Sequence, residues 1–254
     1  KVLTSLMTVF ILGTWFLTLW LMLTNVLRPI LIPAFLLFSF IVISAVGLIL
    51  PITQAKAGIF ETITDGPVYE MTVDLLDKAG LKLDQVQIFI KPGKESNAAV
   101  NGYRGSYYII INQSLLEALS SEELRAILAH EVAHIKNRDG IKRFFDFVLF
   151  LLLPYSLLAA AVLLPKQSFA NDFLGIAGLI SLVALFLRWL YRSRKGEYAA
   201  DLLAAEILGD KETLIQALTI INEKSRFKPD FLASRKPLLT HPDLTSRIAN
   251  LRKA

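Results

Sequence analysis

Hydrophobic residues in this chain fall into four long apolar segments, separated by stretches in which polar and charged residues recur every few positions. The first segment, residues 2–27, holds 26 positions without a charge, more than the roughly 20 that a helix needs to cross a bilayer. Residues 30–50 form the second segment, directly after Arg28 and Pro29. A signal peptide would carry a small-residue cleavage site after a short apolar core. We therefore predict a transmembrane hairpin over residues 1–51.

Residues 144–187 contain the other two apolar segments and predict a second membrane hairpin. The third segment carries Asp146 near its start, where we expect this side chain to cap the helix or to face lipid headgroups. The fourth, residues 173–187, offers only 15 uncharged residues before Arg188. A shallow re-entrant hairpin is therefore an alternative to a full crossing.

The two remaining stretches, residues 52–143 and 188–254, have the composition of a soluble domain. Apolar residues recur on one helical face over residues 65–79, and alternation over residues 85–91 predicts a strand. Further apolar runs flank a glycine-containing turn at residues 101–105. These patterns predict an α+β fold in which a multi-pass helical membrane protein carries a domain with a small antiparallel sheet.

Composition and charge limit which residues can bind a metal and indicate on which side of the membrane this domain lies. Hydrophobic residues make up 54% of the 254, and there is no cysteine, so any metal must be held by His, Asp or Glu. Lys and Arg near the ends of the apolar segments number ten on the side of the domain, against only Arg28 and Lys166 on the other side. This asymmetry predicts that the domain faces the cytoplasm. The basic residues are not interleaved with aromatic ones, so nothing indicates nucleic acid.

One predicted helix, which begins after Ser120, contains the candidate catalytic residues. Ser120 and Glu123 have the spacing of a capping box, and the helix then presents His130, Glu131 and His134 in the pattern H-E-x-x-H. Residues four apart share a helix face, so both imidazoles can bind one cation, with Glu131 beside it as a base. The pattern therefore predicts a zinc peptidase site.

A catalytic zinc needs a third protein ligand and one open position. Glu197 is the best candidate, and Asp201, one turn further on, would hydrogen-bond a ligand. His134 lies ten residues before Phe144 and Glu197 nine residues after Arg188, which places both roughly 13–15 Å above the bilayer at a rise of about 1.5 Å per residue. Two exposed acids are the alternative interpretation.

These motifs resemble the HtpX heat-shock and CAAX-prenyl protease family of integral membrane zinc metallopeptidases. The resemblance rests on H-E-x-x-H, on E-x-x-A-D at residues 197–201, on the placement of the apolar segments, and on THPDLTSRIANL at residues 240–251. It implies a zincin-type (gluzincin) domain with one Zn²⁺ per chain, held by His130, His134 and Glu197. It also implies that Glu131 is the catalytic glutamate and that Asp201 supports a ligand.

Other positions are assigned from the resemblance or from their setting in the sequence. His241 would close on the active-site cleft and stabilise the oxyanion, while Arg247 is expected to be a structural ion-pair partner. Asn97 and Ala98 resemble the family's substrate-binding edge strand, although the next three residues depart from its pattern. Gly196 stands where an arginine is common. The pair Tyr107–Tyr108 is expected to serve sheet packing first.

Together these observations predict a zinc-dependent endopeptidase in the inner, cytoplasmic membrane, with its catalytic domain, residues 52–143 and 188–254, at the cytoplasmic face. Its partners would be the bilayer and protein or peptide substrates, mainly misfolded or membrane proteins, in quality control and stress response. A CAAX-type prenyl-protein peptidase is one alternative, although the resemblance implies more membrane spans in that branch. A non-enzymatic membrane adaptor stabilised by zinc is the other.

Overall fold

The computed structural model describes residues 60–82, 84, 86–93, 97–103, 105–165, 168–225 and 242–253. The first predicted hairpin, residues 1–51, and His241 lie outside these residues. The chain divides into two compact units, which we describe separately. In the described part, the first unit comprises residues 145–189, and the second comprises residues 60–144 and 190–253.

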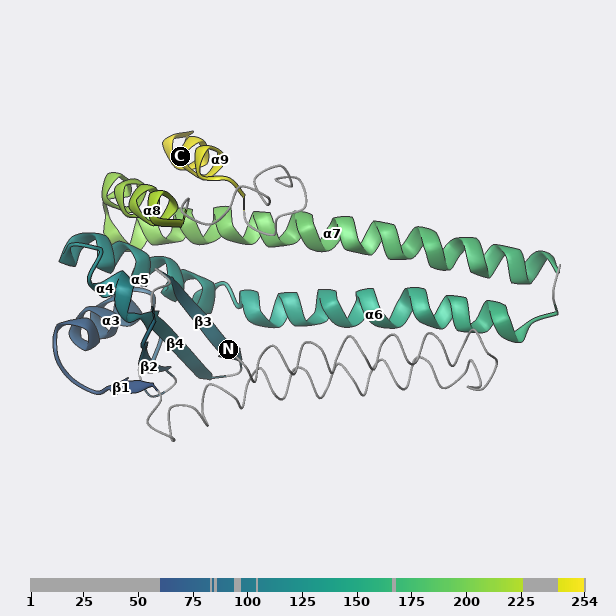
Figure 1. The fold of residues 1–254 in the computed structure, drawn as a ribbon, viewed down its shortest axis with the longest axis horizontal. Helices are drawn as coiled ribbons and strands as arrows, with labels where there is room; N and C mark the ends of the chain where they lie inside the picture. Colours follow the sequence, from purple (N-terminus) through teal and green to yellow (C-terminus); the bar gives the residue numbers. More distant parts are fainter. Residues whose placement is uncertain are drawn as a thin grey trace. The chain divides into compact units, whose positions relative to one another are not determined.

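The second unit contains a four-stranded sheet with the strand order β1-β2-β4-β3 (Figure 1). The strands are β1 (Glu61–Ile63), β2 (Val86–Lys91), β3 (Ala98–Tyr103) and β4 (Ser106–Asn112). The pairs β1–β2 and β3–β4 are antiparallel. The central pair β2–β4 is parallel. The sheet is therefore mixed, and the prediction of an antiparallel sheet is wrong for its central pair.

The composition of β4 explains this arrangement. Ile109 and Ile111 are 0% exposed, so β4 takes a central position where both of its edges are paired, and the less apolar β3 takes the edge. Because β4 lies between β2 and β3, β2 cannot form the hairpin with β3 that the sequence order suggests. The β3–β4 turn is tighter than predicted, since β3 continues to Tyr103. Gly102 permits this, with φ 111° and no room for a Cβ atom, which would lie 2.0 Å from the carbonyl oxygen of Ser106.

Helices of the second unit supply the rest of its core. They are α3 (Pro67–Lys78), α4 (Gln113–Leu116), α5 (Ser121–Lys136), α8 (Lys211–Ser225) and α9 (Leu244–Lys253). Pro67 in the first turn of α3 and Gly80 at φ 66°, just after its end, are the predicted start and stop signals. Helix α5 is the centre of the unit: 11 of its 16 residues are buried, and they pack with residues of α3, β4 and α8. The site on α5 is therefore held in a rigid core.

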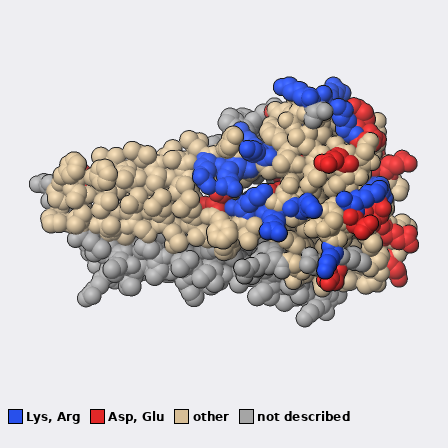
Figure 2. Space-filling view, turned by 180° about the vertical axis from the view of Figure 1, so that it is seen from behind, with Lys and Arg blue, Asp and Glu red and all other residues tan. Residues whose placement is uncertain are grey.

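Helices α6 (Asp139–Leu163) and α7 (Phe169–Leu208) are, in the described part of the chain, the two that are long and apolar enough to cross a membrane. Over residues 145–189 they form the described part of the first unit. Their apolar side chains are open to the surroundings, as in Phe145 and Ile180, both 63% exposed. Figure 2 shows this uncharged surface in tan. Such exposure suits contact with lipid.

Asp146 of α6 is paired with a residue that the sequence did not indicate. Its side chain is 7% exposed, and its Oδ1 lies 3.4 Å from Nε and Nη2 of Arg188 on α7. An ionised residue inside an apolar helix pair needs such a partner. The carboxylate thus contacts Arg188, instead of serving as the helix cap or headgroup contact that the sequence suggested.

Candidate metal centre

The predicted capping box marks the start of α5 and so determines where the candidate site residues lie along the helix. Ser120 Oγ accepts a hydrogen bond from the Glu123 amide at 3.3 Å, and the Ser120 amide donates to Glu123 Oε2 at 2.8 Å. A helix that begins at Ser121 places His130, Glu131 and His134 on its later turns, where all three are buried. The local signal in the sequence therefore fixes where these side chains lie.

Three potential ligand atoms converge at this place. The Nε2 atoms of His130 and His134 are 3.1 Å apart, and each lies 3.6 Å from a carboxylate oxygen of Glu197 on α7. All three ligand atoms lie within 4.8 Å of one another. Two ligands at about 2.0–2.1 Å from a tetrahedral zinc are themselves roughly 3.3 Å apart, so these separations suit one metal ion.

A carboxylate holds the other ring nitrogen of each histidine. Asp201 Oδ1 is 3.0 Å from Nδ1 of His130, and Asp139 Oδ2 is 2.8 Å from Nδ1 of His134. A proton held at each Nδ1 leaves both Nε2 lone pairs directed toward Glu197, where they can bind a metal ion. The donor set, two imidazoles and one carboxylate, is that of a catalytic zinc.

Asp139 is a site residue that the sequence reasoning missed. Helix α5 ends at Lys136, and Arg138 then adopts φ 55°, a left-handed conformation that is uncommon outside glycine. This residue turns the chain so that Asp139, the first residue of α6, returns to His134. The backbone of Gly196 passes nearby, since a Cβ there would lie 3.6 Å from Asp139 Oδ2. The available signal was an acid five residues after the second histidine.

Replacing Asp139 with Asn should weaken metal binding without unfolding the chain. The neutral amide loses the charge that favours a proton on Nδ1 of His134, so that Nε2 becomes a poorer ligand. We expect the metal affinity to fall about 10- to 100-fold, measured by competition with a chromophoric chelator. Asp77→Asn, at an exposed acid of α3, is the matched control. Equal affinity in both variants and the wild type would show that Asp139 does not orient His134.

Arg247 of α9 holds the carboxylate of Asp201, which contacts His130. Its Nε lies 2.8 Å from Asp201 Oδ2 and its Nη2 lies 2.5 Å from Asp201 Oδ1, and its Nη1 is 3.8 Å from Glu197 Oε2. Burial raises the pKa of Asp201, but the hydrogen bonds from Arg247 and His130 outweigh burial and hold it below its usual value. The expected role of Arg247, that of an ion-pair partner, is the one its geometry shows.

The same contacts change the protonation of His130. Burial lowers the pKa of its imidazole, but the hydrogen bonds with Asp201 and Glu197 prevail and raise that pKa from 6.5 to about 9. In the metal-free protein a protonated His130 thus stabilises the fold fully below about pH 6.5, and this contribution is lost as the pH rises through about 9. A metal ion must displace this proton when it binds.

The remaining predicted residues lie at or near the sheet edge. Ala98 is the first residue of β3, the edge strand, and the carbonyl of Asn97 accepts a hydrogen bond from the Asn112 amide at 3.0 Å. Tyr108 stacks on Phe89, with ring centroids 6.1 Å apart, as expected for sheet packing. Tyr107 instead lines a cleft that also contains His134.

Comparison with known proteins finds a matching family, similar sequences and a similar solved structure. Residues 63–254 match peptidase family M48. A "Protease HtpX homolog" of Chlorobium limicola is 29% identical over 243 residues, covering 83% of this chain and 82% of that protein. Another from Acidiphilium cryptum is 31% identical over 203 residues, covering 70% of each. The crystal structure of S. mikatae Ste24p matches with a TM-score of 0.67 at 25% identity, covering 98% of this chain and 64% of that one.

Proposed function

We infer that this chain, which belongs to peptidase family M48 and is a membrane-embedded metallopeptidase acting on peptides or proteins, works with zinc. In this proposal His130, His134 and Glu197 hold the ion, one per chain. The supporting observation is the convergence of two imidazole nitrogens and one carboxylate within 4.8 Å, with a carboxylate behind each imidazole. Three ligands leave a fourth position open for a reactant, as a catalytic zinc requires.

Glu131 is proposed as the general base. It follows His130 on α5 and is buried. When bound, zinc supplies a Lewis acid that lowers the pKa of a coordinated water to about 7 and polarises the scissile carbonyl. Glu131 would take the proton from the attacking water and return it to the leaving amine, which completes hydrolysis of the peptide bond. His241 is proposed to stabilise the oxyanion.

We place the catalytic part, residues 52–143 and 188–254, at the cytoplasmic face of the inner membrane, on the distribution of Lys and Arg around the apolar segments. The chain would cross the membrane several times and cleave misfolded or membrane proteins. The four apolar segments favour this substrate class over prenylated C-terminal peptides, because the resemblance implies more membrane spans in the CAAX branch. The adaptor alternative fits less well, since a purely structural zinc needs a fourth protein ligand and the described part of the chain brings three together.

Removing and restoring the metal tests this function. Protein stripped with a chelator should lose cleavage of casein and regain it on addition of zinc, to one ion per chain. Because His130 releases a proton on metal binding, the zinc concentration that restores half of the activity should rise about tenfold per unit as the pH falls below about 9. Cleavage that survives complete removal of the metal would contradict the proposal.

A further inference from the structure

A cleft of about 1140 Å³ opens beside the proposed metal centre, entirely within the second unit. It lies between the chain after α3, the β3–β4 hairpin, and the turn that joins α5 to α6. His134 is one of its lining residues. A substrate bound in this cleft would therefore reach the proposed metal ligand.

The charges in this cleft have one sign. Among the residues that the structure describes, no aspartate or glutamate lines it, whereas Lys136, Arg138 and Arg143 do, and all three are exposed. Within the part of the chain that the structure describes, none of the three has a carboxylate partner within 4.0 Å, unlike neighbouring Lys142, which pairs with Asp139 at 3.4 Å. These cations are therefore available to an anionic ligand.

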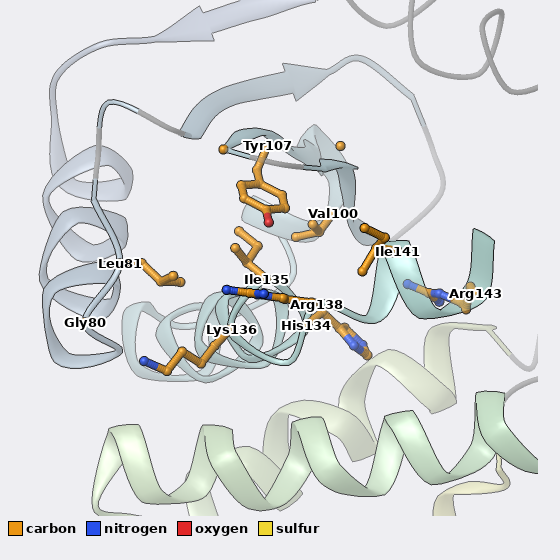
Figure 3. A pocket seen from close by; sticks show the side chains of 13 residues that line it. Gly80, Leu81, Val100, Tyr107, His134, Ile135, Lys136, Arg138, Ile141 and Arg143 are labelled. Atoms are coloured by element: carbon orange, nitrogen blue, oxygen red, sulfur yellow. The ribbon is translucent and has the colours of Figure 1, made fainter. Parts of the chain in front are cut away.

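The turn sets the backbone of one of these cations in a defined conformation. Arg138 occupies the left-handed conformation, at φ 55°, which costs free energy in a residue with a Cβ atom and persists only where the surroundings impose it. Figure 3 shows its side chain between Tyr107 and His134, with Lys136 to one side and Arg143 to the other. In this view its guanidinium nitrogens lie on the side of Lys136, away from the ring of His134.

The wall itself suits an extended peptide. In the described part of the chain, strand β3 has a sheet partner on one side, and a substrate backbone can pair with its other side. Val100 and Gly102, two residues apart, line the cleft. Alternate side chains of a bound peptide face the same way, so at defined positions they would point toward the cations.

We propose, resting on the peptidase function inferred above, that Lys136, Arg138 and Arg143 form a subsite for a carboxylate of the substrate. The carboxylate comes from an Asp or Glu side chain, or from the C-terminus of the peptide. The three cations are exposed, so we expect a modest preference of about three- to tenfold in kcat/KM, weakened by salt.

The test uses the full chain, purified in detergent and loaded with zinc. Its substrates are peptides of one neutral sequence in which a single Glu or Gln moves along the chain, each made with a free acid or an amide at the C-terminus. The readout is the ratio of kcat/KM between matched Glu and Gln peptides, or between acid and amide. We expect a ratio of about three to ten at one position or at the terminus, and this result identifies the source of the carboxylate.

Two variants and one control assign that ratio to the cleft. Arg138→Asn removes the charge with a residue that tolerates positive φ, and combined with Lys136→Gln it should bring the ratio close to one. Arg138→Lys should keep most of the ratio. Lys91→Gln, at an exposed lysine of β2 outside the cleft, should leave both rate and ratio unchanged. Zinc content, measured for each variant, reports folding.

Two results would overturn the proposal. The first is a ratio of one at every position in the wild type, and the second is a ratio that survives in the double variant. If the double variant in that second case also loses binding to vesicles of anionic lipid, the cations are assigned to the membrane surface. Both results leave the peptidase function standing. Absence of cleavage of every peptide by the zinc-loaded wild type would instead remove that function.

Discussion

Replacing Glu131 with Gln is expected to reduce peptide cleavage by about 10²- to 10⁴-fold while zinc binding remains close to that of the wild type. Gln has the same shape and can still fill the buried position on α5, but it cannot accept the proton of the attacking water. Cleavage of casein and the zinc content of the purified chain measure the two effects.

The fold of this variant should also be unchanged, because Glu131 is not among the three converging ligands. Thermal unfolding in the presence of zinc checks this. A variant that cleaves as fast as the wild type would show that another group serves as the base. A variant that lacks both zinc and activity would give Glu131 a role in binding the metal.

Replacing Glu197 with Gln should weaken zinc binding, whereas replacing Glu131 should leave it close to that of the wild type. Binding of a four-ligand structural zinc is worth about 10–16 kcal/mol, so one ligand carries about 2.5–4 kcal/mol, or roughly 100- to 1000-fold in affinity. The amide is a much weaker ligand than the carboxylate that lies 3.6 Å from both Nε2 atoms. Equilibrium dialysis against buffered zinc measures the loss.

The two glutamate variants control each other. Both replace a buried Glu in the same site with an isosteric amide, yet one should keep zinc and the other should lose it. Equal zinc content in both would remove Glu197 from the ligand set. Excess zinc should partly restore activity in Glu197→Gln but not in Glu131→Gln.

The parts of the structure that could be predicted are those whose signals are local. Ser120 and Glu123 determine where α5 begins, because a capping box is complete within four residues. The amphipathic face of α3 and the alternation of β2 are equally local. The spacing of His130 and His134 then follows from helix geometry alone.

The parts that could not be predicted depend on residues far apart in the sequence. Periodicity predicts strands but not which neighbours they take, so the central place of β4 and its parallel pairing with β2 were missed. The pair of Asp146 with Arg188 joins residues 42 positions apart. Asp139 was missed for another reason, because only the left-handed turn at Arg138 brings it back to His134.

The central proposal is a metal site divided between two segments of the chain, with 62 residues between His134 on α5 and Glu197 on α7. It couples the two polar stretches that flank the second apolar hairpin. The ligands should be assembled only in a chain whose α6 and α7 return Glu197 to the histidines.

The most direct measurement is the X-ray absorption spectrum of zinc in the purified, metal-loaded full chain, compared with that of Glu197→Gln. Two imidazole nitrogens and one carboxylate oxygen, each at about 2.0–2.2 Å from the ion, are predicted for the wild type, with loss of the carboxylate in the variant. A third imidazole in the wild-type spectrum, or identical spectra from the two proteins, would contradict the divided site.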